Sequence, residues 1–397
     1  MSIAITGKQV SDGLVLCCDT FNRKSYVGQP TTNYVTYPLA NWNGSAFVLS
    51  YNYANNGVSY TFDTSVATPI GDFSGVMKYY TGNTDYKYWS ILMSGLSSGT
   101  YAFSYYAKAS VAGGINNQQL WRDSGTDRSV SGDWNPSYTT EWKRYVTVGP
   151  ISVGNYLDYF PIHSGALTGG VYVYFWGFQL EKLSYATQFA NGSRSNTQGL
   201  LDLTGNYSVS LSSAEYDSSA DITYSSTGVV SAGNLGSGYT NYTIECWFNS
   251  SDIVNYRNVF DANYTTYSPN TGNVGPRLEQ YSNGTILMAW SGNTSNNSLF
   301  NTSNQFSISP NRYNHFVMTC SGGTMNFYLN GQNVQSNVSS AQGYVTSFAD
   351  VKIGVGFALD GSRYFRGKIP KFAVYKRVLT AAEVLRNYSV IKRRYGL

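Results

Sequence analysis

Short runs of alternating hydrophobic and polar residues cover most of the chain, and Gly, Asn, Ser and Pro separate one run from the next. Thr100–Ala107, Thr240–Asn249 and Asn314–Thr319 are three such runs. A period of two residues places successive side chains on opposite faces of a strand. Many short strands with turn residues between them predict antiparallel sandwiches and argue against βαβ units. The chain is therefore expected to be all-β.

Two of these patterns carry more detail. Gly170–Leu180 predicts a strand that is apolar on both faces and therefore buried on both sides. One face would carry Tyr172, Tyr174, Trp176 and Phe178, and the other Val171, Val173 and Phe175. Asn330–Gly331 lies between two β-type runs and predicts a two-residue hairpin turn, because both turn positions favour positive φ.

One segment near the end of the chain departs from the β pattern. Thr380–Glu383 has the form of a capping box, in which the Thr and Glu side chains each bond a backbone N–H of the first turn. Apolar residues follow at helical spacing, at Val384, Leu385, Tyr388 and Ile391. The pattern predicts a short α-helix over residues 380–394 that packs through this face.

Composition narrows the class of protein. The chain has 397 residues, of which 16% are aromatic and only 12% are charged. Coiled coils and helical bundles are rich in Ala, Glu, Lys and Leu, and disordered chains have few aromatic residues, so both classes are excluded. No apolar run reaches the length of about 18 residues that a membrane-spanning helix needs. Residues 1–7 lack the basic and apolar regions of a secretory signal, so none is expected.

The cysteines give a prediction about oxidation state. Cys17 and Cys18 are adjacent and cannot easily bridge each other, whereas Cys246 and Cys320 lie in apolar runs. Buried free thiols in a reducing compartment are the preferred interpretation, and a Cys246–Cys320 disulfide is the alternative. With two histidines and no Cys-x-x-Cys pair, no zinc site is expected.

The net charge of +4 arises at the end of the chain. Residues 371–397 carry seven basic side chains and one acidic side chain. Lys392, Arg393 and Arg394 would leave the predicted helix together, either as a solvated face or as a docking site for an acidic partner surface. Nucleic-acid binding is not expected, because basic residues are not interleaved with stacking aromatics elsewhere.

Several motifs in the second half of the chain resemble those of a known protein family. They are Tyr242–Phe248, Asn311–Thr319, Asn326–Gly331 and Tyr364–Val378, with Leu379–Val384 next. In content and order they resemble the concanavalin-A-like, laminin-G-type sandwich, in the version found in structural proteins of tailed bacteriophages. The match covers about half of the chain and implies a sandwich that ends in a helix with a basic terminus.

The start of the chain resembles the same phage proteins. In that family, an opening such as Asp12–Tyr26 runs almost directly into a turn such as Leu201–Asn206. Here a long stretch separates the two, and an insertion explains the separation. The resemblance therefore implies that residues 1–28 supply the first strand of the sandwich formed by residues 196–397, and that residues 29–195 form an inserted domain.

The insertion has a resemblance of its own. Thr140–Thr147, Tyr174–Lys182 and residues 186–189 are similar to the jelly rolls of carbohydrate-binding-module type in phage tail and virion proteins. With this insertion, the expected fold class is all-β, with two antiparallel β-sandwich or jelly-roll domains and one short C-terminal α-helix.

The candidate binding chemistry lies in Gln118–Tyr138. Trp121, Trp134 and Tyr138 are expected in loops, with Asp123 and Asn135 beside them. Pyranose rings place an apolar face on aromatic side chains, and polar side chains bind their hydroxyls, so this segment is the carbohydrate-binding candidate. Contacts between subunits or loop packing are the alternative.

Catalysis and cofactors are not expected. Glycoside hydrolysis needs two carboxylates about 5–9.5 Å apart, and Glu245 has no acidic neighbour on its strand face. A structural calcium is the one cofactor left open, with Asp360, Asp217 and Asp261 as conceivable ligands and ordinary loop aspartates as the alternative.

The combined expectation is a non-enzymatic bacteriophage virion protein, assembled in the host cytoplasm. It would be an exposed capsid decoration or fibre, or a tail-fibre-like appendage, and could bind host or environmental glycans. Its partners would be capsid or tail subunits and further copies of itself, a homotrimer first, because phage appendages commonly close with threefold symmetry. Membrane insertion is not expected. A lectin of a cellular organism and a phage glycan depolymerase are the alternatives.

Overall fold

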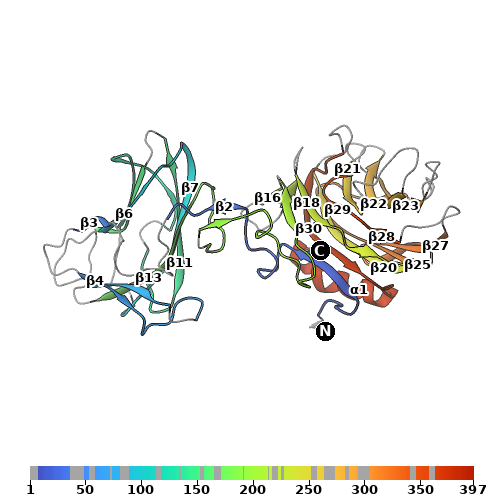
Figure 1. Ribbon diagram of the computed structural model, residues 1–397, viewed down its shortest axis with the longest axis horizontal. Helices are drawn as coiled ribbons and strands as arrows, with labels where there is room; N and C mark the ends of the chain where they lie inside the picture. Colours follow the sequence, from blue (N-terminus) through green and yellow to red (C-terminus); the bar gives the residue numbers. More distant parts are fainter. Residues whose placement is uncertain are drawn as a thin grey trace. The chain divides into compact units, whose positions relative to one another are not determined.

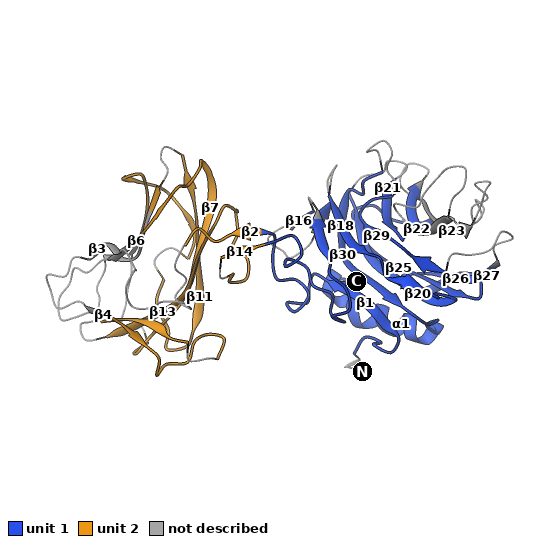
Figure 2. Cartoon of the chain, viewed as in Figure 1, with its two compact units in different colours: residues 1–30, 195–397 blue, residues 31–194 orange. Residues whose placement is uncertain are grey.

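In the computed structural model, the chain divides into two compact units (Figure 1). Unit 1 contains residues 1–30 and 195–397, and unit 2 contains residues 31–194 (Figure 2). The structure describes residues 8–35, 49–52, 59–71, 74–80, 89–112, 118–133, 136–152, 156–164, 171–190, 192–212, 214–216, 222–224, 228–251, 257–262, 273–281, 286–293, 305–339, 346–356 and 363–397. Unit 2 is thus inserted in unit 1, within two residues of the limits 29–195 expected from the sequence.

Unit 1 is built from two large antiparallel sheets. The eight-stranded sheet has the order β16 (Glu215–Tyr216), β17 (Ile222–Tyr224), β30 (Gly367–Tyr375), β20 (Asn241–Ser250), β25 (Tyr313–Ser321), β26 (Thr324–Leu329) and β27 (Gln332–Ser339), and β1 (Leu14–Asp19) also pairs with β30. The seven-stranded sheet has the order β15 (Ser210–Ser212), β18 (Val229–Gly233), β29 (Val351–Ile353), β21 (Arg257–Asp261), β22 (Asn273–Tyr281), β23 (Ile286–Asn293) and β24 (Gln305–Ser307). A small pair joins β19 (Gly236–Ser237) and β28 (Ser347–Phe348). The two large sheets meet through aromatic rings, such as Phe260 of β21 and Phe372 of β30, whose centroids are 5.3 Å apart.

The start of the chain belongs to unit 1. Strand β1 pairs along Lys371–Tyr375 of β30, the strand that leads toward the C-terminal helix. The turn after the insertion returns to the same strand, because the backbone N–H of Cys17 donates to Asp202 at 2.8 Å and the N–H of Leu203 donates to the Cys17 carbonyl at 2.9 Å. The two halves of the split opening therefore lie side by side, and a strand from the first 28 residues pairs within the later sandwich.

The helix α1 spans Ala381–Ile391 and begins with the predicted capping box between Thr380 and Glu383. It ends earlier than expected, because residues Lys392–Tyr395 form a 3-10 turn. Its buried side chains are Val384, Asn387 and Ile391, whereas Leu385 is 43% exposed. Val384 and Ile391 are buried as predicted, but the prediction that Leu385 packs with them is wrong, because Leu385 points away from the buried face.

Unit 2 also contains two antiparallel sheets. The six-stranded sheet has the order β10 (Ser131–Gly132), β11 (Lys143–Ile151), β7 (Gly99–Ala109), β13 (Tyr172–Glu181), β5 (Val76–Tyr80) and β4 (Ser59–Asp63). The five-stranded sheet has the order β3 (Leu49–Asn52), β6 (Trp89–Ser94), β12 (Tyr156–Ser164), β8 (Gln118–Asp123) and β9 (Thr126–Asp127), and a short pair joins β2 (Thr31–Thr32) and β14 (Ser193–Arg194). The sheets meet in an aromatic core, where Phe103 of β7 and Tyr159 of β12 are 4.2 Å apart between ring centroids.

Strand β13 differs from its prediction. Gly177 has φ +64°, and the pairing register with β7 shifts between Trp176 and Gln179. This irregularity turns Phe178 to the same core as Phe175, where the ring centroids are 5.9 Å apart. Tyr172, on the opposite face, is 37% exposed, so this end of the strand is buried on one side only.

Other predictions concern turns, thiols and membrane spans. Both residues of the Asn330–Gly331 turn have positive φ, 51° and 79°, which confirms the hairpin between β26 and β27. All four cysteines are free and buried, so the disulfide alternative is wrong. In the described ranges, no helix has the length and hydropathy needed to cross a bilayer.

Candidate functional site

The carbohydrate-binding candidates from the sequence do not form an exposed platform. Trp121 lies in β8, is fully buried, and donates from Nε1 to the Pro150 carbonyl at 3.0 Å. Tyr138 is also fully buried, with its hydroxyl 3.0 Å from that of Tyr105. Tyr138 lies between strands β10 and β11, as expected, whereas Trp121 lies in a strand and not in a loop. The prediction that the two rings face a sugar is wrong, because both fill the core of unit 2.

Of the polar and aromatic residues expected beside Trp121 and Tyr138, one is bonded within unit 2 and two lie outside the described residues. Asp123 is fully buried, accepts a hydrogen bond from Arg128 at 3.1 Å and another from the Ser152 backbone at 2.8 Å. It therefore anchors two segments of unit 2 and is closed to a ligand. Trp134 and Asn135 lie outside the described residues.

The conceivable calcium ligands are not brought together by the described structure. Asp261 ends β21 and is only 3% exposed, whereas Asp217 and Asp360 lie outside the described residues. Across the described ranges, no cluster of three or more His, Cys, Asp or Glu side chains is placed to hold a metal ion.

Two of the three cations at the helix exit contact their own unit. Arg394 donates to Asp19 at 2.9 Å, because the 3-10 turn brings it to the end of β1. The Nζ of Lys392 lies 5.3 Å from the ring centroid of Tyr388. Arg393 is exposed. Two of the side chains expected to dock on a partner therefore already have contacts within the chain. Docking remains a prediction for the exposed part of this cluster.

A carboxylate lies fully buried between β20, β30 and α1. Glu245 accepts hydrogen bonds from Lys371 at 2.7 Å, His315 at 3.2 Å, Asn387 at 2.8 Å and Tyr375 at 3.3 Å. Burial alone would raise the pKa of Glu245, but the charge of Lys371 and the hydrogen bond from His315 outweigh it and hold the pKa far below its usual range. Burial lowers the pKa of His315. Glu245 is thus a structural anion that holds the helix to the sheet, and it has neither exposure nor a second carboxylate for general acid–base chemistry.

An exposed set of side chains lies on the outer face of the six-stranded sheet of unit 2. Tyr174 of β13 pairs directly with Lys78 of β5 on one side and with Lys108 of β7 on the other. The two Nζ atoms lie 5.9 and 5.5 Å from the Tyr174 ring centroid. Lys78 also lies 4.4 Å from the ring of Tyr172, and Lys108 lies 5.1 Å from the ring of Trp142. We call these five residues the aromatic–lysine face.

This face has unsatisfied positive charge. Lys78 pairs with Asp63 at 3.3 Å, whereas Lys108 has no carboxylate partner among the described residues. The rings of Trp142, Tyr172 and Tyr174 are partly exposed. The face therefore offers aromatic surface and hydrogen-bond donors together. The cross-strand pairs that bring these residues together join positions that are 96 and 66 residues apart, so no local sequence motif reveals them.

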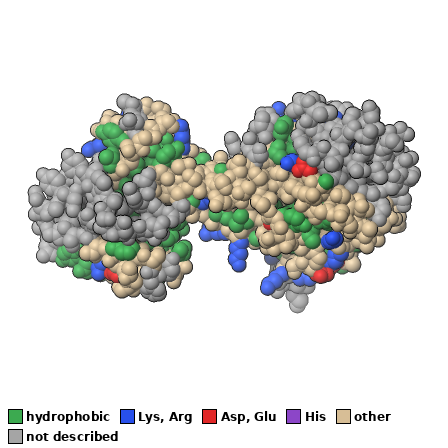
Figure 3. Space-filling model, viewed as in Figure 1, with side chains coloured by type: hydrophobic (Ala, Val, Ile, Leu, Met, Phe, Trp, Pro, Cys, Tyr) green, Lys and Arg blue, Asp and Glu red, His purple; other side chains and the backbone are tan. Residues whose placement is uncertain are grey.

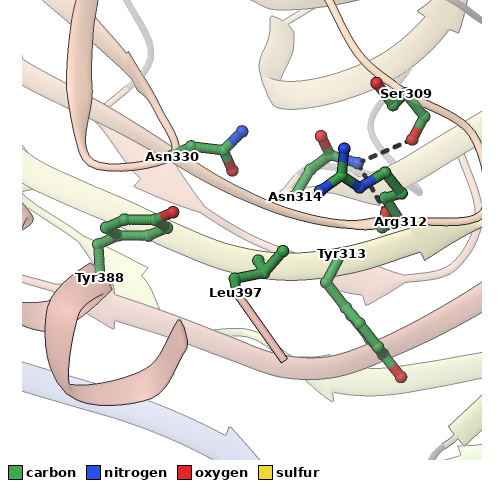
Figure 4. A pocket seen from close by; sticks show the side chains of 7 residues that line it. All are labelled: Ser309, Arg312, Tyr313, Asn314, Asn330, Tyr388 and Leu397. Carbon is green, nitrogen blue, oxygen red and sulfur yellow. Dashed lines mark hydrogen bonds between the residues drawn. The ribbon is translucent and has the colours of Figure 1, made fainter. Parts of the chain in front are cut away.

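A pocket of 170 Å³ lies in unit 1, beside α1 and the β26–β27 turn (Figure 4). Its lining side chains come from the segment before β25, from β25 itself, from the turn, from α1 and from the last residue, Leu397. Besides Leu397 they are Ser309, Arg312, Tyr313, Asn314, Asn330 and Tyr388. The described lining is polar and aromatic, and none of its side chains is an Asp or a Glu. The sequence analysis did not single out this pocket, because its residues come from four separate segments.

Comparison with protein families supports the fold of unit 1. Residues 223–385 match the laminin-G-type family described as the concanavalin A-like lectin/glucanases superfamily. Unit 1 therefore has the concanavalin-A-like sandwich fold. No curated protein matches the chain significantly.

Solved structures give distant matches. Domain 4 of AbnA, a GH43 extracellular arabinanase from Geobacillus stearothermophilus in complex with arabinotriose, is 14% identical, with a TM-score of 0.38; the match covers 49% of this chain and 93% of that one. The receptor-binding domain of botulinum neurotoxin C/D mosaic serotype is 18% identical, with a TM-score of 0.39, and the match covers 49% of this chain and 50% of that one. A structure of botulinum neurotoxin type C is 15% identical, with a TM-score of 0.37 and 50% of each chain covered. The chain thus spans about half the length of these two toxin structures.

Proposed function

We propose that this chain is a non-enzymatic, glycan-binding protein of a bacteriophage virion, and that unit 2 contacts an extended glycan through its aromatic–lysine face. The observation that supports this proposal most directly is a row of side chains across three paired strands. The row is Lys78–Tyr174–Lys108, and Tyr172 and Trp142 flank it. Sugar rings place their C–H faces on aromatic side chains and their hydroxyls on donors such as ammonium groups. A strand face holds such groups in fixed positions, which lowers the entropic cost of binding.

Two observations support a binding role without catalysis. The aromatic rings of this face are partly exposed, in contrast to Trp121 and Tyr138 in the core. The buried Glu245 is fully bonded within unit 1. On the side of the molecule shown in Figure 3, most of the described surface carries uncharged side chains, in line with the low share of charged residues in the chain, 12%.

The virion role is supported by the resemblance of both chain ends to tailed-phage structural proteins. The insertion leaves β1 paired with β30, so the chain keeps the order of that family's motifs around an added domain. We propose that the protein is an exposed capsid decoration, fibre or tail appendage, that it assembles as a homotrimer with capsid or tail subunits as partners, and that Arg393 belongs to the docking face. Antibody labelling of virions in negative stain tests the location, and light scattering tests the trimer.

Glycan binding is tested with Tyr174→Ala and Lys108→Gln on an array of host polysaccharides. Each change should weaken binding about three- to tenfold, because an aromatic contact contributes about 0.5–1.5 kcal/mol. Leu92→Ala is the matched control, since Leu92 is 43% exposed on β6 of the opposite sheet. Binding that is unchanged in both variants would rule out this face, and reducing sugar released from any bound polysaccharide would contradict the non-enzymatic role.

A further inference from the structure

We infer that the pocket beside α1 in unit 1 is a second binding site, specific for a sugar that carries a carboxylate, such as a uronic acid residue. This site goes beyond the glycan contact proposed for unit 2, because the pocket is lined by residues 309, 312–314, 330, 388 and 397, all of them in unit 1. The ligand class rests on the donors, the charge and the size of this pocket.

Three of the donors that line the pocket, on Arg312, Asn330 and Tyr388, are unused among the described residues. Figure 4 shows Tyr388 directing its hydroxyl into the pocket, with Asn330 and Asn314 across from it. Within the described residues, the Arg312 guanidinium, the Asn330 amide NH₂ and the Tyr388 hydroxyl form no hydrogen bond or ion pair. An Arg guanidinium has five N–H donors in a planar fork, and a carboxylate accepts two of them in parallel. Arg312 is therefore suited to hold the carboxylate, and the other two groups are suited to hold hydroxyls.

The Tyr388 and Asn330 side chains, and the backbone that carries Arg312, are held in place by the surrounding structure. The ring of Tyr388 stacks on that of the fully buried Trp247, with centroids 5.6 Å apart and planes 3° apart. The Asn330 side chain accepts the backbone N–H of His315 at 2.9 Å, which orients its NH₂ group. The Asn314 side chain donates to the carbonyl oxygens of Arg312 at 2.9 Å and Ser309 at 3.4 Å, which fixes the segment that carries Arg312. A site that is ordered before binding loses little entropy when a small ligand enters.

The charge around the pocket favours an anion. Lys392 lies over the ring of Tyr388, with its Nζ 5.3 Å from the centroid, and Arg312 is exposed and unpaired among the described residues. Among the residues that the structure describes, no Asp or Glu side chain lines the pocket. A neutral sugar would leave the Arg312 charge without a counterpart, whereas a carboxylate supplies one at short range.

The size of the pocket favours a single sugar residue. Its volume of 170 Å³ is below the range of about 300–1,000 Å³ that is usual for drug-sized ligands. It therefore accommodates one ring of a glycan, with the rest of the chain outside. Tyr388 contributes its hydroxyl to the lining of this space.

The test uses the full chain and saturation-transfer NMR with methyl β-D-glucuronide and its neutral counterpart, methyl β-D-glucoside. We expect the glucuronide to bind at least about tenfold more tightly than the glucoside, in line with the strength of charge-assisted hydrogen bonds. Arg312→Gln should abolish this preference, and Arg312→Lys should restore only part of it, because lysine cannot form the bidentate pair. Arg386→Gln is the matched control, since Arg386 is exposed on α1 but does not line the pocket.

Four outcomes decide the inference. Equal affinity for the two glycosides, or wild-type binding by Arg312→Gln, would overturn it. Displacement of the glucuronide by equimolar sulfate would show a general anion site and would overturn the sugar class. Loss of the preference in Arg312→Gln alone supports it. The same titration in Tyr172→Ala/Tyr174→Ala separates this site from the proposed function, because that variant removes the unit 2 face and should keep the glucuronide preference.

Discussion

The buried ion pair between Lys371 and Glu245 gives the most direct test of what holds α1 to the sheet. Both side chains have no exposed surface, and Nζ and Oε1 are 2.7 Å apart. Lys371→Met keeps the length of the side chain but removes the charge that compensates the carboxylate. Leaving one partner of a buried pair alone costs about 3–5 kcal/mol. For a domain of this size, that loss corresponds to a fall in Tm of about 6–20 °C.

The partners of Glu245 that remain in Lys371→Met limit the loss of stability and place it toward the lower end of about 3–5 kcal/mol. Asn387 on α1 still donates to Oε2 at 2.8 Å, and Tyr375 still lies 3.3 Å away. Neither supplies positive charge. His315 can supply it only by taking a proton, which its burial opposes, because burial lowers its pKa. The variant should therefore be relatively less destabilised at pH 5 than at pH 8.

Urea unfolding followed by tryptophan fluorescence measures the effect, since Trp247 stacks on Tyr388 of α1. In Lys371→Met/Glu245→Gln, most of the lost stability should return, because neither charge is then buried alone. Arg122→Met is the control: it breaks the Arg122–Asp127 pair, whose side chains are 37% and 61% exposed, and should change stability by less than about 1 kcal/mol. A Lys371→Met protein within 1 kcal/mol of the wild type, or a double variant less stable than the single one, would refute the reasoning.

Three further predictions concern the capping box, the thiols and the hairpin turn. Hydrogen bonding to Arg377 holds the pKa of Glu383 at about 2, below its value in the unfolded chain. The contribution of ionised Glu383 to the free energy of unfolding is therefore full at neutral pH and is lost as the pH falls toward 2. Glu383→Gln should lower the urea midpoint at pH 7 and make stability less dependent on pH in the acid range. Burial raises the pKa of Cys17 to about 12, and all four thiols are buried, so native protein should resist iodoacetamide while urea-unfolded protein takes up four labels by mass spectrometry. Gly331 has φ +79°, and a Cβ there would lie 2.8 Å from the ring of Tyr388. Gly331→Ala should therefore lower the free energy of unfolding in urea by at least about 1 kcal/mol and weaken glucuronide binding. Gly322→Ala is the control, because a Cβ at Gly322 meets open space, and it should leave glucuronide binding unchanged.

Local patterns in the sequence determined the elements of this protein. Alternation predicted the strands, the positive-φ preferences of Asn330 and Gly331 predicted their hairpin, and the Thr380–Glu383 box predicted where the helix begins. These signals succeed because each depends on a few neighbouring residues. The separated motifs Asp12–Tyr26 and Leu201–Asn206 also predicted the insertion, because the two halves of one opening must meet in space.

Tertiary structure alone decided which side chains are available for binding. Trp121 and Tyr138 have polar neighbours in the sequence, yet both rings lie in the core, Trp121 from strand β8 and Tyr138 from the segment between β10 and β11. The irregularity at Gly177 moves Phe178 inward and leaves Tyr172 and Tyr174 outward, a result that a strict period of two cannot show. The aromatic–lysine face and the pocket of unit 1 each combine segments far apart in the chain. Their geometry depends on register and packing, which arise from contacts between distant residues and leave no signature in any one segment.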